Sequence, residues 1–420
     1  MSRRFLFLQG PHGPFFRQLA AGLTRAGASC RRIAFNRGDR VFWQDDATCD
    51  SFHGEIADWP AACAALLDKH AITDLVLYGD TRPVHRIAID KARARGITVH
   101  VFEEGYLRPW WITYERGGAN AHSPLMSINL AEMRAALDNP NAPPVEAPGH
   151  WGSLRRHSVY GALYHGLVLS GGPKIASHRD IPVAREMRLH LARLLKTPIR
   201  ALGRRIATAR VRRGDYPYHL VLLQLDHDAS FRDHGPFPDT SAFLETVISG
   251  FAEGAPPHHH LVFKAHPLED GRIPQARLIR TISARHGLSD RIHYIAGGKL
   301  ARLLDTATSA VTVNSTAAQQ ALWRGLPVKA FGRGVYTRPE FVSAQPTARF
   351  FADPQRPDRA AYDVFRQFLL ETSQLPGSFY AAGGRRQLCR KLPDLMLSRA
   401  DPYAKTGAAQ PQHLHLHRSR

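Results

Sequence analysis

The stretch VTVNSTAAQQALWRGLPVKAFG, residues 311–332, decides how the chain folds. It begins with a β-branched run, passes through a small hydroxyl-rich turn into a helix-forming segment, and ends in a second apolar run. A strand, a helix and a second strand in this order form a βαβ unit, whose two strands lie parallel in one sheet. The stretch therefore predicts a parallel sheet that carries its ligand groups on the loops after its strands.

The same alternation of strands and helices extends upstream and recurs in the first hundred residues. In the second half of the chain we expect strands at 219–225, 260–265, 291–296 and 309–314, with helices near 241–251, 274–286 and 316–324. In the first half the expected strands are 3–10, 30–35, 74–79 and 97–105, with helices that begin near residues 15, 60 and 83. The chain is therefore predicted to hold two Rossmann-like halves.

Length and the breaks in this alternation set the expected domain boundaries. A chain of 420 residues with 44% hydrophobic content is too long for one compact core. The alternation stops near residue 139, where Pro-rich and then strongly basic sequence begins. We expect an N-terminal domain at 1–138, a basic helical connection at 139–215, a C-terminal domain at 216–350, helices at 351–400 and a disordered tail at 401–420.

Composition indicates a cytoplasmic protein with an anionic partner. The four cysteines lie far apart, without the spacing of a disulfide framework or a zinc ribbon. The N-terminus is too short for a signal-peptide core, and no run reaches the roughly 20 apolar residues of a membrane span. The formal net charge of +20 favours nucleic acid, an acidic membrane surface or an acidic substrate as partner, and charge alone does not choose among them.

The basic segment 185–213 has two interpretations. We expect it to be helical, interrupted at Pro198, with leucine and isoleucine side chains among many arginines. It is either a solvated helical face or a surface that contacts the other domain or anionic lipid head groups.

The glycine fingerprints of two large nucleotide-binding classes are missing from the sequence. No GxGxxG follows the first strand and no GxxxxGK[ST] occurs, which argues against a dinucleotide enzyme and a P-loop NTPase. Two Rossmann-like halves without these motifs indicate a glycosyltransferase of the GT-B type. We therefore predict an α/β, GT-B-like fold with two Rossmann-like domains facing a central cleft, where a nucleotide-sugar binds mainly to the C-terminal domain.

Three polar residues follow strands of the C-terminal half. His266 ends the strand HLVFKA, where it can donate to a phosphate while Pro267 fixes the turn; the alternative is a purely structural histidine. Ser315 and Thr316 begin a helix, so their hydroxyls and the free amides of its first turn form an anion site or an ordinary N-cap. Because His266 lies one βαβ unit earlier, we favour phosphate binding for all three.

Six motifs give the chain a family resemblance. LQGPHGPFFRQL, YGDTRPVHRIAI, VFEEGYLRPWWIT, GGANAHS, KAHP and NSTAAQQALWRGLPVKAFG resemble, in this order, the capsular polysaccharide export proteins of the KpsS and LipB type, over about residues 3–335. The resemblance implies a GT-B-related fold and a retaining β-Kdo transferase. Such an enzyme uses CMP-Kdo to begin a linker on a phosphatidylglycerol acceptor at the cytoplasmic face of the inner membrane.

The resemblance also implies a nucleophile in QLDHDASF, residues 224–231. Related Kdo transferases carry glutamine, two or three variable residues and then an aspartate, which matches Gln224 and Asp228. A retaining enzyme needs such a carboxylate to attack the anomeric carbon. Asp226 is the rival. A metal pair in DHD is disfavoured, and the HHH run at 258–260 is interpreted as a local accident rather than a metal site.

The remaining candidate residues belong to the motifs EEGYLRP, GPHGP and GDTRP and to the helix after Ser315. Glu103 and Glu104 are candidates to deprotonate the acceptor hydroxyl, because paired carboxylates raise one pKa. Other candidates for substrate contacts are Arg108 for a carboxylate or phosphate, Gln320 for the ribose, and His12, Asp80 and Arg82 for the acceptor. Gln320 and Glu104 differ from relatives, which often carry glutamate and aspartate at these two positions. The alternative role for His12, Asp80 and Arg82 is to stabilise their own loops.

The sequence thus predicts a cytoplasmic glycosyltransferase of capsule biosynthesis, peripherally associated with the inner membrane. Its expected partners are CMP-Kdo, an anionic phospholipid acceptor and other capsule assembly and export proteins; no nucleic acid, metal or other cofactor is expected. The alternatives are a GT-B-like transferase or epimerase that uses another nucleotide-sugar, and a non-catalytic polysaccharide-binding component of the export machinery.

Overall fold

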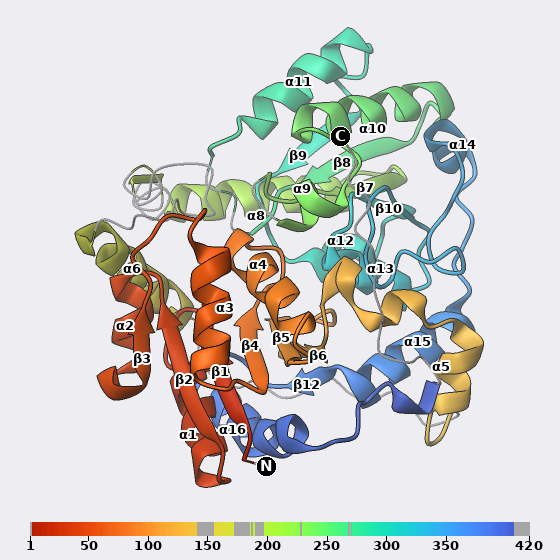
Figure 1. Ribbon diagram of the computed structural model, residues 1–420. Coiled ribbons are helices and arrows are strands. Elements are labelled where there is room, and N and C mark those ends of the chain that lie inside the picture. The colour runs from red at the N-terminus through yellow and green to blue at the C-terminus, as the bar shows by residue number, and fades with distance from the viewer. Residues whose placement is uncertain are drawn as a thin grey trace. The chain divides into compact units, whose positions relative to one another are not determined.

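The computed structural model describes residues 2–140, 155–171, 185, 188–189, 197–226, 229–267, 269 and 271–406. The chain forms two compact units (Figure 1). Unit 1 contains residues 1–184 and 365–420, and unit 2 contains residues 185–364. Each unit is built on its own mainly parallel sheet, which confirms the predicted α/β class with two Rossmann-like units.

Unit 1 has a seven-stranded sheet in the order β12-β6-β5-β4-β1-β2-β3. Its strands are β1 (Arg4–Phe7), β2 (Ser29–Ala34), β3 (Cys49–Ser51), β4 (Asp74–Tyr78), β5 (Thr98–Glu104), β6 (Trp111–Arg116) and β12 (Gln374–Pro376). Strands β1 to β5 are parallel to one another, while β6 and β12 extend the sheet in the antiparallel sense. The sequence did not predict these two antiparallel strands.

Helices cover both faces of this sheet. They are α1 (Phe15–Arg25), α2 (Arg37–Trp43), α3 (Trp59–Lys69), α4 (Pro83–Arg93), α5 (Leu130–Ala136), α6 (Arg155–Gly171) and α16 (Ala382–Leu397). Alternate residues of β1 serve the two faces, because successive strand side chains point in opposite directions. Phe5 and Phe7 pack in the core that α1 and α16 share, and Leu6 and Leu8 pack in the core under α3 and α4.

Unit 2 has a five-stranded, fully parallel sheet in the order β11-β10-β7-β8-β9. The strands are β7 (Tyr218–Leu222), β8 (His260–Lys264), β9 (Ile292–Ile295), β10 (Ser309–Thr312) and β11 (Val328–Ala330). The helices are α8 (Thr197–Arg213), α9 (Ala229–His234), α10 (Thr240–Gly254), α11 (Gln275–Arg285), α12 (Leu300–Leu304), α13 (Gln319–Trp323) and α14 (Thr347–Ala352). The helix expected at 316–324 differs in its first turn, which is the 3-10 helix η4 (Thr316–Ala318).

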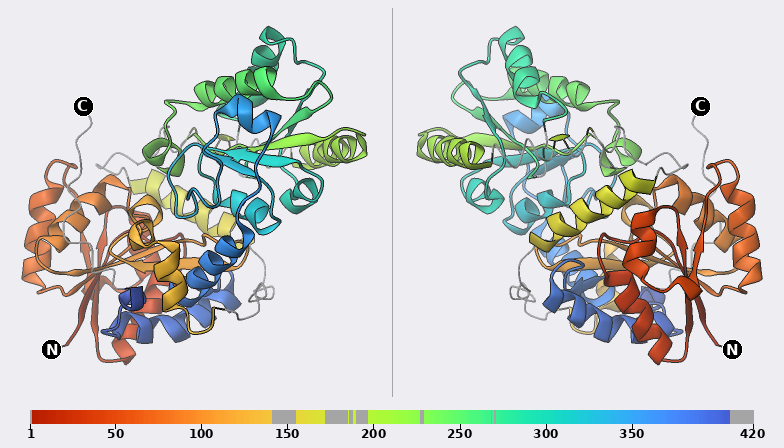
Figure 2. Two further views of the ribbon diagram at one scale, coloured as in Figure 1. Left: turned by 90° about the vertical axis from the view of Figure 1, so that its right-hand side faces the viewer. Right: turned by 90° about the vertical axis from the view of Figure 1, so that its left-hand side faces the viewer.

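The C-terminal part of the chain returns to unit 1. Helix α15 (Arg359–Thr372) spans the boundary between the units, β12 joins the sheet of unit 1, and α16 lies beside α1 (Figures 1 and 2). The first residues of the expected tail, 401–406, are described and are ordered. Tyr403 is buried, and the 3-10 turn η5 covers Ala404–Thr406. Among the described helices, none combines the length and the apolar character that crossing a membrane requires.

Candidate functional site

The strand order of unit 1 places one candidate site at the carboxyl ends of β1 and β4. From β1 the chain continues to β2 and β3 on one side, and β4 and β5 lie on the other side. In open parallel sheets, ligands bind outside the carboxyl ends of the strands where the strand order reverses. The loops that follow β1 and β4 contain His12, Asp80 and Arg82, three of the residues predicted to serve the acceptor.

His12 and Arg82 are both held by neighbouring side chains. The His12 ring stacks on Tyr164 of α6, with 4.4 Å between the ring centroids. Arg82 donates from Nη1 to Oε1 of Gln9 at 3.4 Å, and its guanidinium lies 5.7 Å from the centroid of the Tyr78 ring. Both residues therefore brace the loops around the carboxyl ends of the strands as well as facing that end of the sheet.

Asp80 forms a pair with a histidine that the sequence analysis did not single out. Its side chain is only 3% exposed, and its Oδ2 accepts from the backbone N–H of Ala119 at 2.9 Å and lies 3.2 Å from Nδ1 of His122. The other oxygen, Oδ1, is buried and has no hydrogen-bond partner among the described residues. His122 belongs to the motif GGANAHS, so the only signal in the sequence was a histidine in a loop of small residues.

The loop that carries His122 is fixed by a buried carboxylate on the adjacent strand. Glu115 of β6 accepts hydrogen bonds from the hydroxyls of Ser123, Tyr106 and Tyr403. Burial raises the pKa of Glu115 to about 7, against the opposing effect of the three hydroxyl donors. The Tyr106 hydroxyl also accepts from the backbone N–H of Asn120, so both sides of His122 are tied to the same cluster.

Glu103 and Glu104 have different hydrogen-bond partners among the described contacts. They are consecutive residues of β5, so their side chains leave the sheet on opposite faces. Glu104 accepts from the hydroxyl of Tyr78 at 3.2 Å, while Oε1 of Glu103 accepts from the backbone N–H of Glu104 at 3.0 Å. Burial, with a further contribution from Glu104, raises the pKa of Tyr78 well above its usual value, so Tyr78 stays a proton donor to Glu104.

Arg108 lies in the loop between β5 and β6 and is exposed. Its Nε donates to the carbonyl of Gly105 at 3.2 Å. This contact orients the base of the side chain and leaves the exposed guanidinium available to an anionic ligand.

The reversal of strand order in unit 2 lies between β7 and β10, and a buried amide pair joins the two strands there. Gln224 donates from Nε2 to Oδ1 of Asn314 at 2.8 Å, and its Oε1 accepts from the backbone N–H of Asn314 at 3.0 Å. The same Oε1 also accepts from the Thr312 hydroxyl at 3.3 Å. Gln224 is buried and uses its amide in hydrogen bonds inside the protein, which hold the start of the loop after β7.

Asn314 extends this brace to the loop after β11. Its Nδ2 donates to the carbonyl of Arg333 at 3.3 Å, and the backbone N–H of Arg333 donates to the carbonyl of His234 at 2.8 Å. His234 ends α9, the helix that follows the loop after β7. The start of the loop after β7 is therefore held at Gln224, and the end of α9 is held at His234.

The predicted nucleophile and its rival belong to the segment that follows Gln224 in the sequence. Asp228 itself is outside the residues that the structure describes, and Asp226 is half-buried in the turn directly after β7. Asp228 therefore stays the predicted nucleophile and Asp226 its rival, on the argument from the sequence.

The predicted phosphate contacts follow β8 and β10, the two strands that flank β7. Ser315 caps the short helix through a 3.3 Å hydrogen bond from the backbone N–H of Ala317 to its hydroxyl, and Thr316 and Gln320 are half-buried in the same segment. His266 is half-buried at the carboxyl end of β8, beside β7. All of these residues lie at the carboxyl edge of one sheet. Lys264, the last residue of β8, lies at the same edge and was not singled out from the sequence.

Lys264 is a buried cation in the motif KAHP, two residues before His266. Burial lowers the pKa of its ammonium to about 8, and its Nζ lies 3.4 Å from the carbonyl of Ala265. A lysine at the end of a buried strand is rare enough to have been a signal, because lysine is seldom fully buried without a partner.

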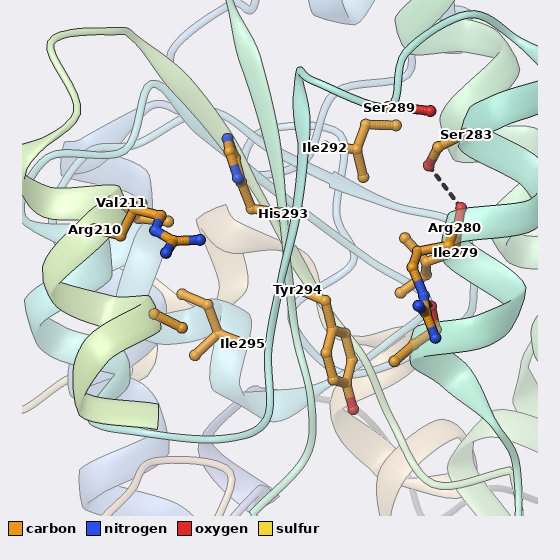
Figure 3. Close-up of a pocket in the computed structure, with 12 residues that line it drawn as sticks. Arg210, Val211, Ile279, Arg280, Ser283, Ser289, Ile292, His293, Tyr294 and Ile295 are labelled. Carbon is orange, nitrogen blue, oxygen red and sulfur yellow. Dashed lines mark hydrogen bonds between the residues drawn. The ribbon is translucent and has the colours of Figure 1, made fainter. Parts of the chain in front are cut away.

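The clearest cavity of unit 2 is away from these residues (Figure 3). It has a volume of about 450 Å³ and lies along the outer strand β9, with Arg210 of α8 on one wall and Arg280 of α11 on the other. None of the predicted site residues lines it. The HHH run lies near this edge: His260 stacks on Tyr216 and lies 2.9 Å from His293 of the cavity, and no group suited to a metal ion occurs among the described residues.

Comparisons with known proteins cover most of the chain. The family model described as capsule polysaccharide biosynthesis protein matches residues 73–380. The capsule polysaccharide modification protein LipB of Neisseria meningitidis serogroup A is 30% identical over 388 residues, or 90% of this chain and 92% of LipB. The capsule polysaccharide export protein KpsS of Escherichia coli is 29% identical over 383 residues, covering 90% and 97%. Among solved structures, Thermosulfurimonas dismutans KpsC, a β-Kdo 2,7 transferase, gives a TM-score of 0.42 at 14% identity, covering 94% and 100%.

Proposed function

This chain belongs to the family of capsule polysaccharide biosynthesis proteins, and from this premise we propose that it is a retaining glycosyltransferase. In this proposal it transfers Kdo from CMP-Kdo to a phosphatidylglycerol-type lipid and so begins the poly-Kdo linker of a capsule. The observation that supports the proposal is the Gln224–Asn314 brace, which holds the start of the loop after β7, where Asp226 lies, at the strand-order reversal of unit 2. A loop held in this way suits a nucleophile that must meet one carbon atom.

The donor half of the reaction belongs to unit 2. Asp228 attacks the anomeric carbon of the sugar, the bond to the nucleotide oxygen breaks, and cytidine monophosphate leaves with the bonding electrons. His266 and the amides and hydroxyls at Ser315 and Thr316 bind the departing phosphate, with the buried cation of Lys264 close by. Gln320 contacts the ribose.

The acceptor half belongs to the carboxyl ends of β1, β4 and β5 in unit 1. A base there removes the proton of the acceptor hydroxyl as its oxygen attacks the enzyme-bound sugar, and Glu103 and Glu104 are the candidates from the sequence. Arg108 binds an anionic group of the substrates, and His12 and Arg82 shape the acceptor side.

The protein acts at the cytoplasmic face of the inner membrane, to which it binds peripherally. Support comes from α8, where the apolar side chains of Leu202 and Ile206 are 60% and 53% exposed on a helix rich in arginine. Exposed apolar residues among basic ones suit an anionic membrane surface. Other capsule assembly and export proteins are the expected neighbours there.

The direct test is turnover by the purified protein. CMP-Kdo and vesicles containing phosphatidylglycerol should yield free CMP and a lipid that carries Kdo, with equal activity in the presence of a metal chelator. Turnover of a different nucleotide-sugar, or interconversion of a sugar without any acceptor, would replace the proposal with another transferase or an epimerase. Binding of polysaccharide without turnover of any nucleotide-sugar would indicate a non-catalytic component of the export machinery.

A further inference from the structure

A buried carboxylate and a partly exposed histidine meet at the carboxyl end of β4. Asp80 is 3% exposed, and its Oδ2 lies 3.2 Å from Nδ1 of His122. The side chain of His122 is 39% exposed, so one end of the imidazole contacts the protein interior and the ring also reaches solvent. A carboxylate behind a histidine that faces solvent is the arrangement in which a histidine serves as a general base.

The contact with Asp80 defines which nitrogen of His122 carries the proton. A carboxylate only accepts hydrogen bonds, so the proton of the neutral ring lies on Nδ1. The lone pair is then on Nε2, at the opposite side of the ring from Asp80. In this tautomer Nε2 is the atom that takes up a proton.

The charge of Asp80 is poorly neutralised by other groups. Apart from His122, its hydrogen-bond donor among the described contacts is the backbone N–H of Ala119, and its Oδ1 is buried without a hydrogen-bond partner among the described residues. A buried carboxylate in this state favours a positive charge on the adjacent ring, because the attraction between them is weakly screened. Asp80 therefore holds the ring of His122 through its Nδ1.

The surrounding loop holds His122 in place. The Ser123 hydroxyl donates to Glu115, the Asn120 N–H donates to the Tyr106 hydroxyl, and Arg93 donates to the carbonyl of Gly117 at 2.6 Å. The charged and titratable groups on the elements next to the pair include Glu115 of β6, on which Asp80 acts electrostatically, Arg93 of α4, which donates to Gly117, and Tyr106, which accepts from Asn120. Arg82 follows Asp80 in the loop after β4, and Glu103 lies near the end of β5. A base whose supporting residues are themselves bonded keeps the geometry that proton transfer needs.

We propose that His122, oriented by Asp80, is the general base that deprotonates the acceptor hydroxyl. This inference rests on the proposed transferase function and changes the assignment of the base. In the second step the acceptor oxygen forms the new bond to the anomeric carbon, the ester bond to Asp228 breaks, and the carboxylate of Asp228 keeps that electron pair. The hydroxyl proton moves to Nε2 of His122 and is later lost to water. Glu104 suits this task less well, because it already accepts from the Tyr78 hydroxyl.

The test separates the two half-reactions. His122→Asn retains a group that can donate to Asp80 and removes the base at Nε2. We expect Kdo transfer to the lipid to fall about 10²- to 10⁴-fold, while the covalent adduct formed from CMP-Kdo and the melting temperature stay as in the wild type. The matched control is His53→Asn, because His53 is an exposed histidine of the same unit, in the loop after β3. Transfer by His122→Asn at the wild-type rate would overturn the assignment.

The pH profile tests the role of Asp80 as a positioning residue. Wild-type transfer should rise with pH because a base must be unprotonated, and Asp80→Asn should lower kcat for transfer while the KM for CMP-Kdo and adduct formation stay as in the wild type, because Asp80 acts through the orientation of His122. His122→Asn and His122→Gln should abolish the rise. If Glu103→Gln abolishes it instead, Glu103 is the base and the assignment to His122 is wrong. If the wild-type protein forms neither adduct nor product, the proposed function fails, whereas intact turnover in both His122 variants removes this inference alone.

Discussion

The two sheets carry their polar groups differently at the point where the strand order reverses. In unit 2, Gln224 and Asn314 satisfy each other through neutral amide contacts that join the loops after β7, β10 and β11. In unit 1 the corresponding edge carries charge, with Asp80 buried beside His122 and the buried Glu115 behind the same loop. A neutral brace fixes a loop without attracting or releasing protons, whereas buried carboxylates make an edge sensitive to protonation. The difference teaches that unit 2 is suited to holding a nucleophile still and unit 1 to moving a proton.

The largest effect should come from the nucleophile of unit 2. Asp228→Asn keeps the shape of the side chain and removes the attacking charge, so transfer should fall by several orders of magnitude while CMP still binds. Mass spectrometry of the wild-type protein with CMP-Kdo should find the adduct on the peptide that contains QLDHDASF. The control is Asp226→Asn, which should keep most activity. A reversed result moves the nucleophile to Asp226, and two active variants would contradict a covalent intermediate.

The contribution of unit 2 to nucleotide binding should be intermediate. His266→Ala removes a charge-assisted contact to phosphate, worth about 1.5–3 kcal/mol, or roughly 10- to 150-fold in affinity for CMP. Titration calorimetry measures this loss, with His258→Ala as the control because His258 is exposed in the same unit. Unchanged CMP affinity in a protein of normal stability would return His266 to a structural role.

Breaking the neutral brace should reduce stability and activity together. Gln224→Ala leaves the buried N–H and Oδ1 of Asn314 without Gln224, which should lower the free energy of unfolding by about 1–3 kcal/mol. A double-mutant cycle with Asn314→Ala should show coupling, because the two side chains share their hydrogen bonds. Gln355→Ala, at an exposed position of unit 2, is the control. A higher KM for the donor without any loss of stability would instead make Gln224 a substrate contact.

The charged cluster of unit 1 should make its stability depend on pH. The pKa of Glu115 is raised to about 7 in the folded protein, above its ordinary value, so the folded state binds the proton more tightly than the unfolded chain. This contribution to stability is fully present below the ordinary pKa of a glutamate and is lost as the pH rises through about 7. Each unit of pKa difference corresponds to about 1.4 kcal/mol.

Chemical unfolding between pH 5 and pH 8 measures this dependence. Glu115→Gln should flatten it, while Glu55→Gln, at an exposed position of unit 1, should leave it unchanged. A wild-type protein whose stability rises over the same interval would show that Glu115 is ionised in the folded state.

The smallest effect of a single change should be on membrane binding. Replacing the exposed Arg205 of α8 in the variant Arg205→Ala should weaken binding to vesicles that contain phosphatidylglycerol by roughly 1 kcal/mol, the contribution of one basic side chain. Arg386→Glu on α16, also exposed, is the control. Sedimentation with vesicles at low and high salt measures the effect, and binding that ignores both salt and anionic lipid would assign the attachment to a different surface.

Sequence reasoning reached the two parallel sheets because their strands and helices differ in hydrophobic period, as residues 219–332 illustrate. It missed β6 and β12, since antiparallel additions depend on which distant segment pairs with an existing edge. Sequence reasoning also singled out Gln224 and Asp80 but not the residues to which they are hydrogen-bonded. Asn314 lies 90 residues from Gln224 and His122 lies 42 residues from Asp80, and only folding brings such residues together. The sequence also offered no sign of which hydrogen-bond partners Glu103 and Glu104 would take, because Tyr78, the partner of Glu104, lies 26 residues away on another strand.

The return of the C-terminal segment to unit 1 sets an order for protein synthesis. Unit 2 is one continuous piece of chain, so it can fold as soon as it has left the ribosome. Unit 1 must wait for β12, for α16 and for Tyr403, whose hydroxyl reaches Glu115. Until then one edge of its sheet is open and the apolar face of α1 lacks α16. The nascent N-terminal segment therefore exposes an apolar surface prone to aggregation for the whole time that unit 2 is synthesised. If translation stops early, the released chain keeps that apolar surface exposed.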